Sequence, residues 1–240
     1  MKAGALVLSL MVLACGGAAP PTTMRSFPLE LPSSGCSGFY VPGALTACAT
    51  PPAPTPTPTP TLDRPARELP MAGSPVQPGR YTRSAFQPRV EFDVGAGWIA
   101  EQVAPGFFDI EDEPGSLDVV AVQFANVVGP DSAVEALDEI AALPNLRLSD
   151  PIDGELVDGK VGIRFEVETT DPADTDPPTF RPVLTVPAGP ISIASGRRLQ
   201  VTLVDIEGGV LAILVGGSIA DWDHALALAT PVVDSITIED

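Results

Sequence analysis

The chain has few of the residues on which most enzymes and nucleic-acid-binding proteins depend. It contains one histidine, His224. It has 13 lysines and arginines against 31 aspartates and glutamates, which gives a net charge of −18. A single histidine leaves at most one candidate base for a Ser-His-Asp triad and cannot form a histidine-rich metal site. Binding to nucleic acid requires a basic surface. We therefore expect no nucleic acid among the partners.

Sequence motifs for catalysis are missing as well. The chain has no G-x-S-x-G elbow, no phosphate-binding loop and no dinucleotide fingerprint. His224 follows Asp223 in an expected helix, off its apolar stripe, and is interpreted as a surface residue. We predict no catalytic residue and no cofactor.

Acidic residues gather at 111–113 and 171–176. Calcium prefers such oxygen ligands, but neither cluster has the spacing of an EF-hand loop. We interpret both clusters as solvated loop charge and predict no metal site.

Carboxylate pairs also serve glycosidases. An extracytoplasmic hydrolase that uses carboxylates or a bound metal therefore stays open as the alternative to a non-catalytic binding or interaction domain.

The chain also lacks an apolar run long enough to cross a membrane. Its longest apolar stretch near the start runs from Ala3 to Ala14, whereas a spanning helix needs ~20 residues. Lys2 precedes this stretch and the small residue Ala14 ends it, which is typical of an export signal over residues 1–14. A signal that is cleaved without lipidation fits Ala14 equally well.

The run Val12-Leu13-Ala14-Cys15 resembles the lipobox of bacterial lipoproteins. The resemblance implies that Cys15 becomes the lipid-modified N-terminus of the mature protein. Each buried methylene of an acyl chain contributes ~0.8 kcal/mol, so several chains hold a protein firmly on a membrane. We therefore expect the protein in the cell envelope, anchored to the extracytoplasmic face of the membrane.

Residues 15–78 are rich in Pro, Gly, Ser, Thr and Ala, and we interpret them as a mostly disordered tether. Within it, Pro51–Thr61 alternates proline with threonine and predicts an extended spacer of roughly 30–35 Å at ~3.1 Å per residue. The threonines could carry O-linked sugars or remain unmodified. With Cys15 lipidated, Cys36 and Cys48 are the remaining cysteines, and we expect a disulfide between them in an oxidising compartment.

Residues 79–240 are expected to form one domain of α+β class, a largely antiparallel sheet packed by two main helices. Ser132 and Glu135 have capping-box spacing at the start of the first helix, which Pro144 stops. The second helix follows Ser218, carries Trp222, Leu226 and Ala229, and is kinked or ended by Pro231. Strands are expected at 90–94, from Trp98, at 107–110 and at 117–128, with hairpins over 156–168 and 199–215 and an edge strand at 236–238.

The order of Phe92-Asp93-Val94, Gly97-Trp98, a mid-chain helix, hairpins and a terminal helix before Asp234-Ser235-Ile236 resembles the PsbP-like fold of exported bacterial lipoproteins. That resemblance implies a fold and an extracytoplasmic setting, and it brings no catalytic residues. The expected partners are the membrane, through the N-terminal lipid, and an envelope protein, a wall polymer or a small apolar ligand.

Overall fold

The computed structural model of the chain describes residues 65–112 and 119–239. The predictions about the export signal, Cys15, the Cys36–Cys48 disulfide, the spacer at 51–61 and Glu113 lie outside these residues. Within them, no helix is both long and apolar enough to cross a membrane.

The described strands form three sheets. A four-stranded sheet has the order β1-β3-β4-β15, and a nine-stranded sheet has the order β2-β5-β6-β7-β14-β13-β10-β8, with β9 also paired to β10. Strands β11 and β12 form a separate hairpin. The β1–β3 pair is parallel, and the other pairs are antiparallel. The strands are β1 Arg67–Glu68, β2 Ser74–Pro75, β3 Gly79–Thr82, β4 Arg89–Val94, β5 Ile99–Ala104, β6 Phe107–Glu111, β7 Ala121–Val127, β8 Leu146–Leu148, β9 Ile152–Val157, β10 Lys160–Thr169, β11 Phe180–Val186, β12 Gly189–Ala194, β13 Arg197–Ile206, β14 Gly209–Ser218 and β15 Thr237–Glu239.

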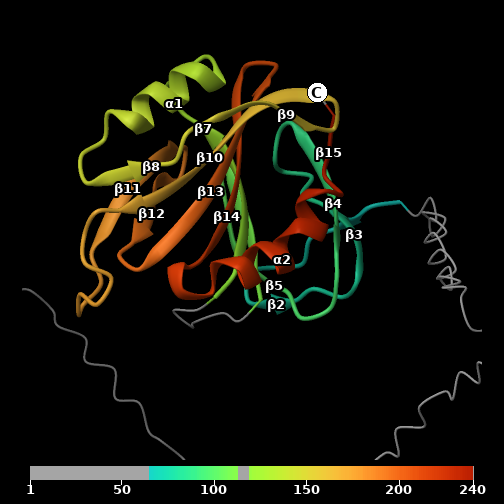
Figure 1. Ribbon diagram of the computed structural model, residues 1–240. Helices are drawn as coiled ribbons and strands as arrows, with labels where there is room; N and C mark the ends of the chain where they lie inside the picture. Colours follow the sequence, from blue (N-terminus) through green and yellow to red (C-terminus); the bar gives the residue numbers. More distant parts are fainter. Residues whose placement is uncertain (1–64, 113–118, 240) are drawn as a thin grey trace, which may run out of the picture. The chain divides into compact units, whose positions relative to one another are not determined.

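The two α-helices of the described region, α1 (Ala133–Ala141) and α2 (Trp222–Val233), pack on opposite faces of the nine-stranded sheet. Figure 1 shows α1 beside β8 and β10, and α2 across β14. The α1 face also carries the β11–β12 hairpin, and its core includes Phe165, Val201 and Leu214. The α2 face carries the four-stranded sheet, and the core on this face includes Phe92 and Phe124. The predicted class, a largely antiparallel sheet packed by two helices, is confirmed.

Local sequence signals placed several elements correctly. Ser132 is the N-cap of α1 and accepts a hydrogen bond from the Glu135 amide at 3.2 Å. The Glu135 carboxylate reaches the amide of Asp131 instead of that of Ser132. The hairpin of β9 and β10 turns at Asp158-Gly159, where both residues have positive φ, as a type I′ turn requires. The hairpin of β13 and β14 turns at 207–208, whereas its two adjacent glycines, Gly208 and Gly209, predict a turn one residue later.

Residues 65–78, which the sequence placed in the tether, belong to the folded region. Leu69 and Val76 are 2 % and 3 % exposed and lie in the hydrophobic core on the α2 face. The Val76 amide donates to the Trp98 carbonyl at 2.8 Å, and the Leu69 amide to the Thr82 carbonyl at 2.8 Å. The predicted boundary at Gly79 therefore moves to Pro65 or earlier, because the isolated apolar residues between prolines and glycines pack into the core.

Helix α2 continues through Pro231 to Val233, so the proline does not end it. Its ring removes the amide that would bond to the carbonyl of Ala227, a residue on the exposed side of the helix where water can replace the bond. Ser218 caps a 3₁₀ turn at Ile219–Asp221, which leads into α2. Trp222 and Trp98 are both buried.

Candidate functional site: a cavity between α2 and the outer strands

One face of the nine-stranded sheet changes from polar to apolar across its strands. The register aligns Arg164 of β10, Thr202 of β13 and Ile213 of β14, and the next row aligns Glu166, Gln200 and Val215. Because cross-strand partners point to the same face, the charged side chains gather on β10 and the apolar ones on β14. Helix α2 lies along the boundary between them.

The start of α2 approaches β14 closely at a glycine. A Cβ placed on Gly217 would lie 2.5 Å from the Cβ of Ala225, so a side chain at this position requires the helix to shift. Trp222 packs against the same glycine. Further along, the helix passes over the polar half of the face, where the side chains do not fill the space beneath it.

A cavity of about 250 Å³ lies there. Strands β9, β10 and β13 supply Glu155, Arg164, Gln200 and Thr202, and α2 supplies Leu226, Ala229, Thr230 and Val233. The cavity therefore has a polar floor and a largely apolar wall. The remaining lining residues are Val157, Asp158, Val215, Asp234 and Ile236.

Thr202 is a polar residue on the cavity floor, and packing alone does not explain why a hydroxyl group lies there. It is only 4 % exposed, yet its hydroxyl has no hydrogen-bond partner among the residues that the structure describes. The side chain of the neighbouring Gln200 likewise has no partner there. Neither polar group is among the fully buried atoms that lack a partner, so both are open to solvent in the cavity. These two side chains offer hydrogen bonds to a molecule in the cavity.

The charges around the cavity are unequal. Arg164, the one cation among the lining residues, is bonded to Glu155 at 3.1 Å. Asp158 uses one carboxylate oxygen to accept from the Ile238 amide at 2.8 Å. Asp234 is exposed, and no side-chain bond of its carboxylate occurs within the described residues.

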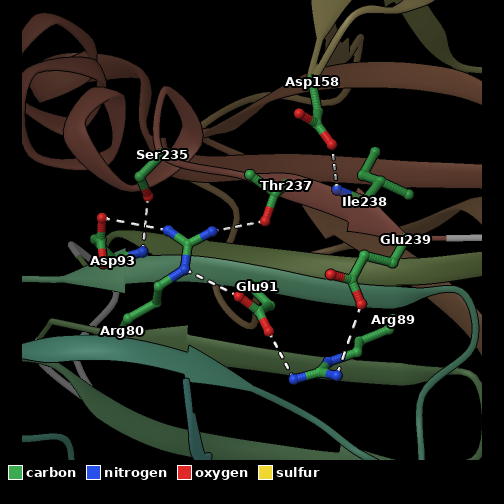
Figure 2. Close-up of polar contacts among 9 residues, drawn as sticks. All are labelled: Arg80, Arg89, Glu91, Asp93, Asp158, Ser235, Thr237, Ile238 and Glu239. Carbon is green, nitrogen blue, oxygen red and sulfur yellow. Dashed lines mark hydrogen bonds and ion pairs between the residues drawn. The ribbon is translucent and has the colours of Figure 1, made fainter. Parts of the chain in front are cut away.

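The residues that follow Asp234 form strand β15, and Figure 2 shows the polar contacts that hold this strand against β4. Arg80 donates to Glu91 at 3.0 Å and to the hydroxyl of Thr237 at 2.6 Å. The Ser235 hydroxyl accepts from the Asp93 amide at 2.7 Å and donates to the Val232 carbonyl at 2.7 Å. These contacts fix β15 against β4, and with the Asp158–Ile238 bond they keep the end of the cavity near Asp234 in place.

A charged cluster lies further along the same face. Arg198 bonds both Glu166 and Glu168, and Arg147 also bonds Glu168. The indole N–H of Trp222 donates to Glu166 at 3.0 Å, and the Arg198 guanidinium lies 5.5 Å from the Trp222 ring centre. Burial raises the pKa of Glu168, but the hydrogen bonds from Arg147 and Arg198 outweigh burial and hold that pKa below its ordinary value. Each charge in the cluster is compensated by another.

The carboxyl group with the strongest pKa shift lies away from the cavity. Asp109 of β6 is 1 % exposed, and burial raises its pKa to about 7 although the Gln102 amide donates to it at 2.6 Å. The neighbouring Glu111 and Glu101 raise that pKa further. Gln123 lies opposite Asp109 on β7, and its amide oxygen has no partner among the described residues. Asp109 has no cation beside it and does not line the cavity.

The residues considered from the sequence as candidates do not meet in one site. His224 and Asp223 are exposed on α2 and do not line the cavity. In the cluster at 171–176, Asp171 forms two hydrogen bonds with Arg181, which hold the pKa of that carboxyl below its ordinary value. Asp112 accepts from the Val120 amide at 2.6 Å. Within residues 65–112 and 119–239, no three His, Cys, Asp or Glu side chains converge as metal ligands.

Sequence reasoning missed the residues of the cavity. Gln200 and Thr202 alternate with the buried Leu199, Val201 and Leu203 on β13, and this alternation is typical of a solvent-facing side. Only the position of α2 over them makes them part of a cavity. No signal in β13 itself predicts that.

Comparison with known proteins gives no family assignment. No protein-family model matches the sequence, and no curated protein matches it. Among solved structures, cyanobacterial PsbP from Synechocystis sp. PCC 6803 has 15 % identity and a TM-score of 0.42, over 70 % of this chain and 97 % of that one. LpqN, involved in cell envelope biogenesis of Mycobacterium tuberculosis, has 10 % identity and a TM-score of 0.37, over 70 % and 90 %.

A structure from Bacteroides thetaiotaomicron VPI-5482 has 6 % identity and a TM-score of 0.34, over 63 % of this chain and 45 % of that one. The three TM-scores are too low to carry a conclusion about activity or ligand. The fold of this chain is therefore described by its own strands and helices.

Proposed function

We propose that this protein is a lipid-anchored binding protein of the cell envelope, and that its folded region holds a ligand in the cavity between α2 and strands β9, β10 and β13. The observation that carries the proposal is the cavity of about 250 Å³ itself, which the Thr202 hydroxyl and the Gln200 side chain line without a hydrogen-bond partner among the described residues. A ligand with matching polar groups can therefore pair with them. The lipobox at Val12–Cys15 and the PsbP-like sequence pattern support the envelope setting and a PsbP-like domain.

Binding without chemistry fits the arrangement of charges. A general acid or base needs a perturbed pKa and access to the substrate. Asp109 has the perturbed pKa but is buried away from the cavity, whereas Glu155 faces the cavity and is bonded to Arg164. The competing function, a carboxylate hydrolase, would need both properties in one residue.

A pair of substitutions on α2 tests the proposal. Thr230 and Ala227 are both exposed, but only Thr230 lines the cavity. Thr230→Phe fills the cavity, and Ala227→Phe adds the same bulk outside it. We expect Thr230→Phe to fail and Ala227→Phe to succeed in restoring a deletion strain, at equal abundance and equal melting temperature. Full restoration by Thr230→Phe would contradict a role for the cavity.

A further inference from the structure

We propose that the cavity beside α2 takes a small organic cation, an aliphatic chain that ends in a primary ammonium group. This inference rests on the proposed function, because it names the class of ligand for that same cavity. Three properties of the lining carry it: its charge, its unpaired acceptors and its apolar wall.

The charge of the lining excludes anions and favours cations. The carboxylates of Glu155, Asp158 and Asp234 face a single cation, Arg164, which is already bonded to Glu155 at 3.1 Å. An anionic ligand would meet uncompensated negative charge, whereas a cation is attracted by it. The net charge of −18 acts in the same direction, since the field of the whole protein raises the local concentration of cations.

Unpaired acceptors match the donors of an ammonium group. A primary ammonium has three N–H donors and no acceptor. The Thr202 hydroxyl and the amide oxygen of Gln200 have no partners among the described residues, and the Asp234 carboxylate is also without a side-chain bond there. An apolar ligand would displace the solvent that reaches the Thr202 hydroxyl and would offer it no hydrogen bond in exchange, which costs free energy.

The apolar wall suits an alkyl stem. Val215, Leu226 and Val233 line the side of the cavity opposite the charged strand β10. The volume of about 250 Å³ lies just below the roughly 300 Å³ at which ordinary small-molecule sites begin. The cavity therefore fits a chain of a few methylenes, such as a free alkylamine or the side chain of a lysine, and is too small for a lipid.

Amide NMR titrations of the full chain in a nonionic detergent test the inference. The probes are butylammonium, 1-butanol and butanoate, which share an alkyl stem and differ in the charge of the end group. We expect butylammonium to give saturable shifts at cavity residues, with a dissociation constant at least tenfold lower than that of either other probe. Acetyl-lysine-methylamide, compared with butylammonium, distinguishes a peptide side chain from a free amine as the source of the ammonium group.

Two variants and a control locate the binding. Thr202→Val removes the hydroxyl at constant shape, and Asp234→Asn removes a charge from an exposed position where folding is not at risk. Each should weaken butylammonium binding about tenfold, as expected for one hydrogen bond to a charged group. Thr185→Val, at an exposed position of β11 outside the cavity, should leave binding unchanged.

Tighter binding of 1-butanol or butanoate at the cavity would overturn the inference and leave the proposed binding function standing. Butylammonium shifts that Asp234→Asn and Thr202→Val do not weaken would overturn it as well. If no probe moves a cavity resonance, the ligand class is wrong, and the restoration experiment with Thr230→Phe still decides the proposed function independently.

Discussion

The indole N–H of Trp222 donates a hydrogen bond of 3.0 Å to Glu166, which ties the first turn of α2 to strand β10. The contact joins the apolar core, where Trp222 is 7 % exposed, to the charged cluster of Glu166, Glu168 and Arg198. The contact therefore anchors the start of the helix whose later turns line the cavity.

Trp222→Ala should destabilise the folded region strongly. The substitution removes a buried ring and its bond to Glu166, and a Trp-to-Ala change in a core costs about 3–5 kcal/mol. Trp222→Phe keeps most of the ring and loses the bond, so its cost should be smaller. Urea unfolding of both variants measures the difference, and an unchanged midpoint for Trp222→Ala would show that the tryptophan does not hold α2.

Gly217→Ala should destabilise the protein by about 1–3 kcal/mol, the usual cost of overpacking. The added Cβ would lie 2.5 Å from the Cβ of Ala225, so the helix must move away from β14. Gly95→Ala is the matched control, because a Cβ there meets no heavy atom within 4 Å. In thermal unfolding, Gly217→Ala should have a lower midpoint temperature than Gly95→Ala. Equal midpoints would argue against the close contact between α2 and β14.

The start of the folded region can be tested by truncation. A fragment of residues 65–240 keeps Leu69 and Val76 in the core, whereas a fragment of residues 79–240 loses both. Burying one such side chain contributes roughly 1.5–3 kcal/mol, so the shorter fragment should be less stable by several kcal/mol or fail to fold. Equal unfolding midpoints for the two fragments would return the boundary to Gly79.

Burial of Asp109 should make stability fall as the pH rises. Its folded-state pKa of about 7 lies above the ordinary value of 3.8, so between these values the folded state keeps a proton that the unfolded state has released. The stabilisation is fully present below about pH 4 and is lost as the pH rises through 7. Since one pKa unit corresponds to about 1.4 kcal/mol, the loss is on the order of 4 kcal/mol.

Asp109→Asn removes this titration and keeps the shape of the side chain. The stability of the wild type minus that of the variant should therefore decrease between pH 4 and 7. Burial and Glu101 also raise the pKa of Glu111, which adds a slope of the same sign to both proteins. The difference between the two proteins removes the part of that slope that does not depend on Asp109. A difference that stays flat across this window would show that Asp109 titrates normally.

Cys15→Ser should release the protein from the membrane or leave it uncleaved, because the proposed anchor is a lipid on the thiol of this cysteine. Fractionation of cells, with the N-terminus determined by mass spectrometry, measures this. Correctly cleaved Cys15→Ser protein that stays in the membrane would refute the lipid anchor.

Elements with their own local signals were predictable from the sequence, and those that depend on distant contacts were not. The Asp158-Gly159 turn and the Ser132 cap follow from backbone preferences of a few residues. The β11–β12 hairpin was missed because Pro182 and Pro190 interrupt its strands, which pair around a register shift next to Pro182.

The cavity was not predictable for a related reason. Its floor comes from three strands and its wall from α2, which begins only at Trp222, so no contiguous pattern contains it. Helix α1 shows the same limit. Val134 shares the helical spacing of Leu137 and Ile140, which predicts a packed position, but it is 59 % exposed. Ala133, Ala136 and Ile140 pack instead, because the β11–β12 hairpin and β13 decide which side of the helix is covered.

The occupancy of the cavity is the most direct test of the account. A crystal structure of the protein soaked in butylammonium should show the ammonium nitrogen within about 3 Å of the Thr202 hydroxyl, and the alkyl chain against Leu226 and Val233. A structure in which the Thr202 hydroxyl bonds to another protein group, and butylammonium binds elsewhere or not at all, would contradict the claim that this cavity is the binding site.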